Sequence, residues 1–343
     1  MAEESFLGQV KRLIVGAPIP SRLAHHERFS RITGLAVLSS DALSSVAYAT
    51  EEILRVLAVG GLAALSLVTP IGAVIATVMI VVVFSYRQTI HAYPSGGGAY
   101  IVAKDNLGRA PSLIAAASLL IDYVLTVSVS IAAGVAAITS AMPQWHAHAV
   151  ALCLAFVILL MLGNLRGIRE SAQLFAGPTY FFIISILLMI AVGAWRYVSG
   201  GIQPLPPLED PLPPGTTLLP LFVLLTAFSN GCTALTGVEA VSNGVPAFRP
   251  PESRNAAATL VAMAVLAITM FIGITLLAHA YGIVPSDTET VVSQIARATF
   301  GGRTTGCRRR RWRSSCWRRT RRTPIFRGSR RSWRATASCR GSS

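Results

Sequence analysis

Residues 37–52 read VLSSDALSSVAYATEE, a stretch that places an aspartate and four serines inside an otherwise apolar segment. A transmembrane helix needs about 20 mostly apolar residues, and residues 32–57 meet this length only if the polar centre is tolerated. A carboxylate at mid-span costs about 2.5–3.5 kcal/mol on insertion scales, so it normally faces a cavity or a partner. We therefore interpret Asp41 as part of a binding site within the membrane.

The composition of the whole chain is that of a polytopic membrane protein. Of its 343 residues, 52% are hydrophobic and 13% are charged, and the mean hydropathy is +0.57. These values lie outside the range of soluble globular domains. We predict an all-α fold with seven transmembrane helices at residues 32–57, 62–85, 112–141, 147–163, 172–198, 218–241 and 257–281.

The net charge of +15 is confined to the end of the chain. From Arg303 onward there are 15 arginines and no Asp or Glu, whereas the preceding residues carry 15 basic and 15 acidic groups. One interpretation is an arginine-rich tail that binds nucleic acid or anionic lipid. The other, which we favour, is a frameshift, because GC-rich DNA translated out of register is rich in Arg, Ser, Trp and Cys codons. The nucleotide sequence of the gene distinguishes the two.

The distribution of Lys and Arg predicts the orientation of the spans. The N-terminal segment and the connections 86–111, 164–171 and 248–256 together hold twelve basic residues, and the alternate connections hold three. Twelve against three places the N-terminus in the cytoplasm. The connection near residue 200 is rich in proline and acidic, as expected of an extracellular loop.

Three acidic residues fall inside predicted spans: Asp41, Asp122 and Glu239. No lysine or arginine is expected at the same depth to neutralise them. Each could instead be protonated and hydrogen-bonded to a neighbouring helix, but three acids in three spans without an internal base favour a cation site.

Oxygen-bearing side chains accompany two of these acids at helical spacing. Asp122, Thr126 and Ser130 are four residues apart, which places them on one helical face. Thr236 and Glu239 are three residues apart, so we expect them to share a face as well.

The first and sixth spans both contain helix-breaking residues at mid-depth. The sequences are SSDALSS around Asp41 and SNGCTALTG around Thr233–Gly237. Interrupted helices at corresponding positions of two halves indicate the binding site of an inverted-repeat transporter. The loop HAYPSGGGAYIVAKDNLG (91–108) lacks the Gly-Lys-Ser/Thr ending of a phosphate-binding loop, so we expect a tight re-entrant or gating turn beside the cavity.

Five motifs of the chain are LSSDALSSVAYATEEIL, AYPSGGGAYIVAKDNLG, LIDYVLTVSVSIAAG, NLRGIRESA and TGVEAVSNGVPAF. They resemble those of the KimA-type potassium importers, in the potassium-uptake branch of the amino acid–polyamine–organocation (APC) permease superfamily, and the similarity runs from about residue 31 to about residue 302. It implies a LeuT-like inverted-repeat fold and potassium–proton symport. Family members continue with further spans and a cytosolic domain, so the fold is expected to be truncated after seven helices and this chain not to transport by itself.

The resemblance also implies roles for individual residues. The positions that match the family's potassium ligands are Asp41, Tyr48, Asp122, Tyr123, Ser130 and Thr236, and Glu239 matches its proton-coupling acid. Hard oxygen ligands suit K⁺, and a carboxyl group can carry a proton. The main alternative is a proton-coupled amino acid permease of the same fold. Its first span would usually be glycine-rich, and here Asp41 would repel the carboxylate of such a substrate.

We thus expect a cytosolic segment at 1–31, a transmembrane domain at 32–302 and a tail without an evolved fold at 303–343. The expected partners are potassium, a proton and the lipid bilayer, with a homodimer as one option. We expect no cofactor, no nucleic acid and no enzymatic activity. The expected location is the inner (cytoplasmic) membrane of a bacterium.

Overall fold

The computed structural model describes residues 28–165, 168–200, 213 and 215–301. Within these residues, six helices are long and apolar enough to cross a membrane, and a bent pair of helices makes a seventh span. The chain is therefore an all-α, multi-pass membrane protein. The predicted cytosolic segment before residue 28, most of the proline-rich connection and the arginine-rich tail lie outside the described residues.

The first span is broken where the sequence predicted a polar centre. Helix α2 (Arg31–Leu38) and helix α3 (Ser40–Leu57) are bent by 43° with Ser39 between them. Ser30 caps the start of α2 with a capping box. Its hydroxyl accepts a hydrogen bond from the backbone N–H of Thr33 (3.2 Å), and the Thr33 hydroxyl accepts one from the backbone N–H of Ser30 (2.9 Å). The predicted interruption is confirmed, but it lies two residues before Asp41, which is in the first turn of α3.

The sixth span is broken at its centre, as predicted. Helix α9 (Leu221–Gly231) runs into a 3-10 turn η5 (Cys232–Leu235), and α10 (Val238–Asn243) follows. Between them Thr236 is extended (ψ 146°) and Gly237 has φ +82°, a left-handed conformation that favours glycine. The expectation that Thr236 and Glu239 share a helical face is wrong, because the helix is broken between them.

The remaining spans are continuous helices. Their bounds are η3 (Leu62–Leu67) with α4 (Val68–Ala92), α6 (Arg109–Ala141), η4 (Pro143–His148) with α7 (Ala149–Leu165), α8 (Ile168–Val198) and α11 (Glu252–Ala280), with short 3-10 turns at η2 (Ala58–Gly60) and η6 (Val245–Ala247). Two further helices, α5 (Gly98–Leu107) and α12 (Val291–Phe300), were not predicted. Each has ten residues, too few to give the apolar length on which the prediction relied.

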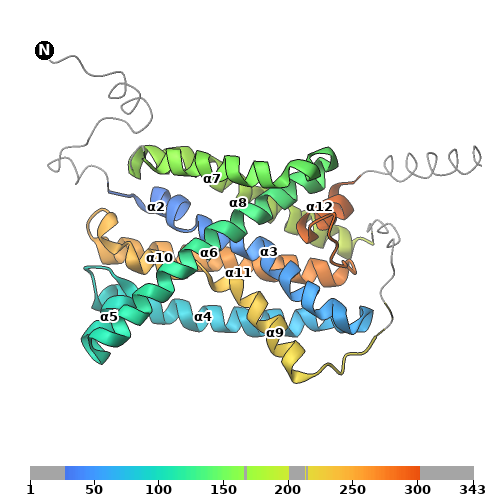
Figure 1. Cartoon of the computed structure of the whole chain (residues 1–343), viewed down its shortest axis with the longest axis horizontal. Coiled ribbons are helices and arrows are strands. Elements are labelled where there is room, and N and C mark those ends of the chain that lie inside the picture. The colour runs from blue at the N-terminus through green and yellow to red at the C-terminus, as the bar shows by residue number, and fades with distance from the viewer. Residues whose placement is uncertain (1–27, 166–167, 201–212, 214, 302–343) are drawn as a thin grey trace, which may run out of the picture. The chain divides into compact units, whose positions relative to one another are not determined.

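Helix α11 is the centre of the packing. It contacts α2, α3, α4 and α8, and α3 contacts α9 and α6 in addition. Helix α7 lies at the edge of the bundle (Figure 1), and none of its described side chains is buried. The two interrupted spans therefore lie against the described helix that has the largest number of buried residues.

Both ends of the first span are tied to the second half of the chain. Before α2, Phe29 packs edge-on against Phe248 (ring centroids 6.4 Å apart), and Arg28 pairs with Glu252 at the start of α11. At the other end, the carboxylate of Glu51 accepts from the backbone N–H of Val291 (3.0 Å), the first residue of α12. Between these ties, the break at Ser39 lies beside the break in the sixth span.

Candidate functional site

The two helix breaks face each other at Asp41 and Gly237. A Cβ atom added to Gly237 would lie 2.9 Å from Asp41 Oδ2 and 2.7 Å from the backbone nitrogen of Ala42. The left-handed glycine thus lets the chain of the sixth span approach the Asp41 carboxylate closely. A bulkier residue would separate the two spans.

Ser45 links the ligands that the sequence proposed on these two spans. Its hydroxyl lies 3.5 Å from Asp41 Oδ1, 3.0 Å from the Tyr48 hydroxyl and 2.8 Å from the Thr236 hydroxyl. The Thr236 hydroxyl also lies 2.8 Å from the carbonyl oxygen of Thr233. Three of the predicted ligands, Asp41, Tyr48 and Thr236, are therefore joined in one polar cluster.

Helix α6 contributes the second group of predicted ligands. Asp122, Tyr123 and Ser130 are half-buried and Thr126 is buried, whereas most residues between them are exposed. The Ser130 hydroxyl is buried without a hydrogen-bond partner among the described residues. The Tyr123 hydroxyl accepts a bond from Asn243 Nδ2 (2.9 Å) on α10. One face of α6 thus presents oxygen atoms to the breaks.

The three carboxylates are close enough to interact electrostatically. Asp41 interacts with Asp122, and Glu239 interacts with both. No ion pair within the described part of the chain includes any of the three. Glu239 Oε1 is buried and has no hydrogen-bond partner there either. Like charges in a medium of low dielectric repel strongly, so a bound cation or a proton would stabilise this arrangement.

Three residues around the site were missed by the sequence interpretation. Ser45 follows Asp41 by one helical turn, a spacing that could have identified it. Asn243 lies on the same span as Glu239 and bonds to Tyr123. Tyr86 on α4 interacts electrostatically with Glu239 and Asp122. No sequence signal points to Tyr86, because a tyrosine within an apolar helix usually indicates packing.

The ligand set consists of carboxylate, phenol and hydroxyl oxygens, which suit hard cations rather than transition metals. The described residues contain no compact group of three His, Cys, Asp or Glu side chains. The carboxylates are instead spread over α3, α6 and α10, with hydroxyl groups between them. Such a site suits a cation that is bound and then released.

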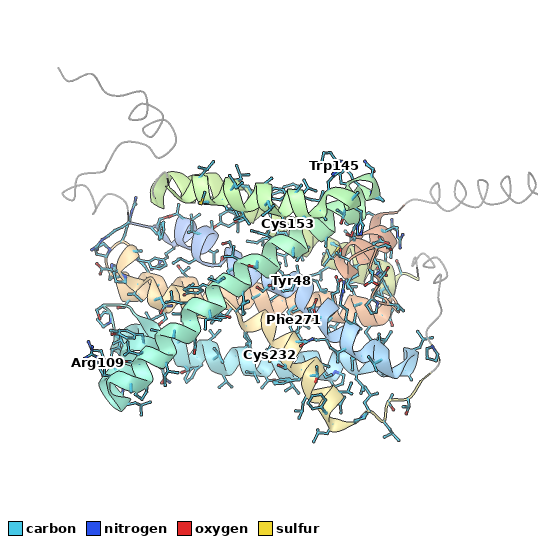
Figure 2. All side chains as sticks on the ribbon, viewed as in Figure 1. Tyr48, Arg109, Trp145, Cys153, Cys232 and Phe271 are labelled. Carbon is cyan, nitrogen blue, oxygen red and sulfur yellow. The ribbon has the colours of Figure 1, made fainter. Side chains whose placement is uncertain are left out.

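The polar cluster lies about midway between the two ends of α6. Arg109 and Trp145, at and just beyond the two ends of this helix, lie near the edges of the bundle, whereas Tyr48 lies near its middle (Figure 2). The cluster around Tyr48 is therefore distant from both ends of the spans.

Comparison with known proteins places the chain in a family. A family model for amino acid permeases matches residues 29–306. The potassium transporter KimA of Bacillus subtilis (strain 168) is 50% identical over 292 residues, which are 85% of this chain and 48% of KimA. The chain thus spans about half the length of that relative. The chain belongs to the amino acid permease family, whose fold is the LeuT-like inverted repeat, and its apolar spans, two of them broken, fit that fold.

Proposed function

We propose that this protein is a proton-coupled potassium importer. One observation carries the proposal: three carboxylates interact electrostatically around two helix breaks, and among the described residues no basic side chain pairs with them and the buried Glu239 Oε1 and Ser130 Oγ have no hydrogen-bond partner. Membrane-embedded acids in this arrangement mark an ion path. The similarity to a potassium transporter agrees with this function.

Potassium is held, in this proposal, by Asp41, Tyr48, Asp122, Tyr123, Ser130 and Thr236. Asp41, Tyr48 and Thr236 already converge through Ser45. The unpartnered hydroxyl of Ser130 and the carboxylate of Asp122 lie on the covered face of α6. A dehydrated cation would replace its water with these oxygens, and the two carboxylates would supply the compensating charge.

Glu239 is proposed to carry the proton. It lies in the first turn of α10, directly after the break, and one of its oxygens is buried without a partner among the described residues. A proton on Glu239 removes its repulsion towards Asp41 and Asp122, so both aspartates can remain charged and hold the cation. Proton and potassium can therefore occupy the site together, which symport requires.

A proton-coupled amino acid permease is the second candidate, and the description of the family model favours it. An amino acid would have to present its carboxylate to the broken spans. Asp41 lies in the first turn of α3, directly after the break at Ser39, and interacts with Asp122. The site is therefore anionic at the place where such a permease needs hydrogen-bond donors for the substrate's carboxylate. This argues for a bare cation.

The proposed location is the inner (cytoplasmic) membrane with a cytosolic N-terminus, supported by the twelve-to-three distribution of basic residues. The 33 residues of α6 span about 50 Å, so the connections before and after this helix should lie on opposite sides of the membrane. Single cysteines at the exposed positions Ser95 and Gln144 should label from opposite sides, with Ser95→Cys protected from external reagent. External labelling of Ser95→Cys would overturn this topology.

Rescue of a potassium-uptake-deficient bacterium tests the function. We expect the frame-corrected gene to restore growth at limiting potassium, and uptake to fall when the proton gradient is collapsed. Proton-driven uptake of amino acids without potassium uptake would favour the second candidate instead. Assembly as a homodimer stays a prediction, which light scattering of the purified protein checks.

A further inference from the structure

Asn243 ends α10 and contacts the proposed potassium site directly. Its side-chain amide Nδ2 donates to the hydroxyl of Tyr123, a proposed ligand, at 2.9 Å. The other side-chain atom, Oδ1, is buried and has no hydrogen-bond partner among the described residues. The Nδ2 end of the Asn243 amide therefore contacts the proposed potassium site, and its Oδ1 end does not.

The other end of Asn243 lies against the glycine-rich loop between α4 and α5. A Cβ on Gly98 would overlap Asn243 Oδ1, and a Cβ on Gly96 would lie 2.7 Å from the Asn243 carbonyl oxygen. Gly96, Gly97 and Gly98 all have positive φ, at 78°, 93° and 44°. Only a run without side chains can pass so close to Asn243 in this conformation.

We propose that Asn243 is a positioning residue that couples the cation site to the Gly96–Gly98 loop. This proposal rests on the proposed potassium transport and adds a pathway from the site to the loop. The Asn243 amide fixes the orientation of the Tyr123 hydroxyl, whose remaining lone pair faces the cation. The Oδ1 end of the same amide packs against Gly98 in the loop, so a change at Tyr123 that turns this planar group alters the packing of the loop.

The coupling has a definite thermodynamic consequence. If potassium stabilises one orientation of Tyr123, it must also stabilise the loop conformation that fits the corresponding orientation of Asn243. Linkage is reciprocal: the factor by which potassium stabilises this loop conformation equals the factor by which the loop conformation strengthens potassium binding. Loosening the contact between Asn243 and the loop must therefore weaken potassium binding. Loss of one neutral hydrogen bond corresponds to a factor of about five in affinity.

Hydrogen exchange of the purified chain in detergent, with potassium chloride or choline chloride, measures the coupling. In the wild type we expect potassium to slow amide exchange of the segment 93–101. In Asn243→Ala we expect faster exchange, a potassium response below about twofold, and potassium affinity lowered about fivefold. In a Tyr123→Phe background, Asn243→Ala should change the affinity by less than about twofold, because the acceptor is already gone.

Asn106→Ala is the matched control. Asn106 Nδ2 also donates to a tyrosine hydroxyl, that of Tyr93 (3.2 Å), beside the same loop but without contact to a proposed ligand. This variant should speed exchange of the loop and leave its potassium response and the potassium affinity unchanged.

The outcomes separate the two proposals. If the wild type binds potassium and Asn243→Ala keeps its potassium response, or if its effect adds to that of Tyr123→Phe, the coupling through Asn243 is wrong and the potassium site stands. If the wild type itself shows no potassium binding, the proposed site is wrong and the coupling fails with it.

Discussion

Replacement of Gly237 by alanine should weaken potassium binding strongly. Gly237 joins the 3-10 turn to α10 with φ +82° and lies against Asp41 and Ala42. The added Cβ meets the backbone nitrogen of Ala42 at 2.7 Å, and backbone atoms in a packed helix cannot move aside cheaply. The substitution therefore acts on the contact between the two broken spans.

The magnitude follows from two terms. A left-handed conformation costs alanine about 1–2 kcal/mol, and forcing a methyl group into a packed site typically costs about 1–3 kcal/mol more. Without an ion, α10 can shift away from α3 and relieve much of this strain. Ion binding requires the close approach, so at least about 2 kcal/mol should appear as lost affinity, which is roughly a 30-fold rise in the dissociation constant.

Potassium-dependent thermal stabilisation of the purified protein measures this effect. Gly134→Ala is the control, since Gly134 is an exposed position within α6 with no heavy atom within 4 Å of an added Cβ. That variant should keep the wild-type potassium dependence and gain up to about 1 kcal/mol of helix stability. Equal potassium affinity in Gly237→Ala and Gly134→Ala would refute the close contact as a requirement for binding.

The remaining predictions concern the carboxylates. Asp122→Asn should lower potassium uptake by the frame-corrected protein by tenfold or more, because a neutral amide replaces a charged ligand; unchanged uptake at limiting potassium would exclude Asp122 from the site. Glu239→Gln should abolish proton-driven accumulation and retain some ion binding, since glutamine offers an oxygen but cannot lose a proton, and persistent pH-dependent uptake would contradict this role. Glu51→Ala removes the acceptor of the Val291 N–H and should lower the melting temperature by several degrees. The control is Glu52→Ala, at a half-buried position, which should lower the melting temperature less. Equal shifts in the two variants would show that the contact with α12 contributes little.

The sequence by itself determined the membrane class, the seven spans and both interruptions. These features depend on local chemistry: the apolar length of each segment, the serine-rich stretch around Asp41, and the polar, glycine-containing stretch around Gly237. The same local reasoning failed where a helix is short, as in α5 and α12, because ten residues carry too weak an apolar signal. It also failed for the pair Thr236 and Glu239, because helical spacing has no meaning across a break.

Only the tertiary structure decided which residues complete the site. Ser45 joins three predicted ligands, Tyr86 on α4 is within electrostatic range of Glu239, and Asn243 contacts both Tyr123 and the Gly96–Gly98 loop. The spacing of Ser45 one turn after Asp41 is a local signal, but neither the type nor the spacing of Tyr86 and Asn243 distinguishes them from other residues of apolar helices. Their role arises from contacts between segments distant in the chain, such as the 120 positions that separate Tyr123 from Asn243. Such contacts are fixed by helix packing and not by local sequence.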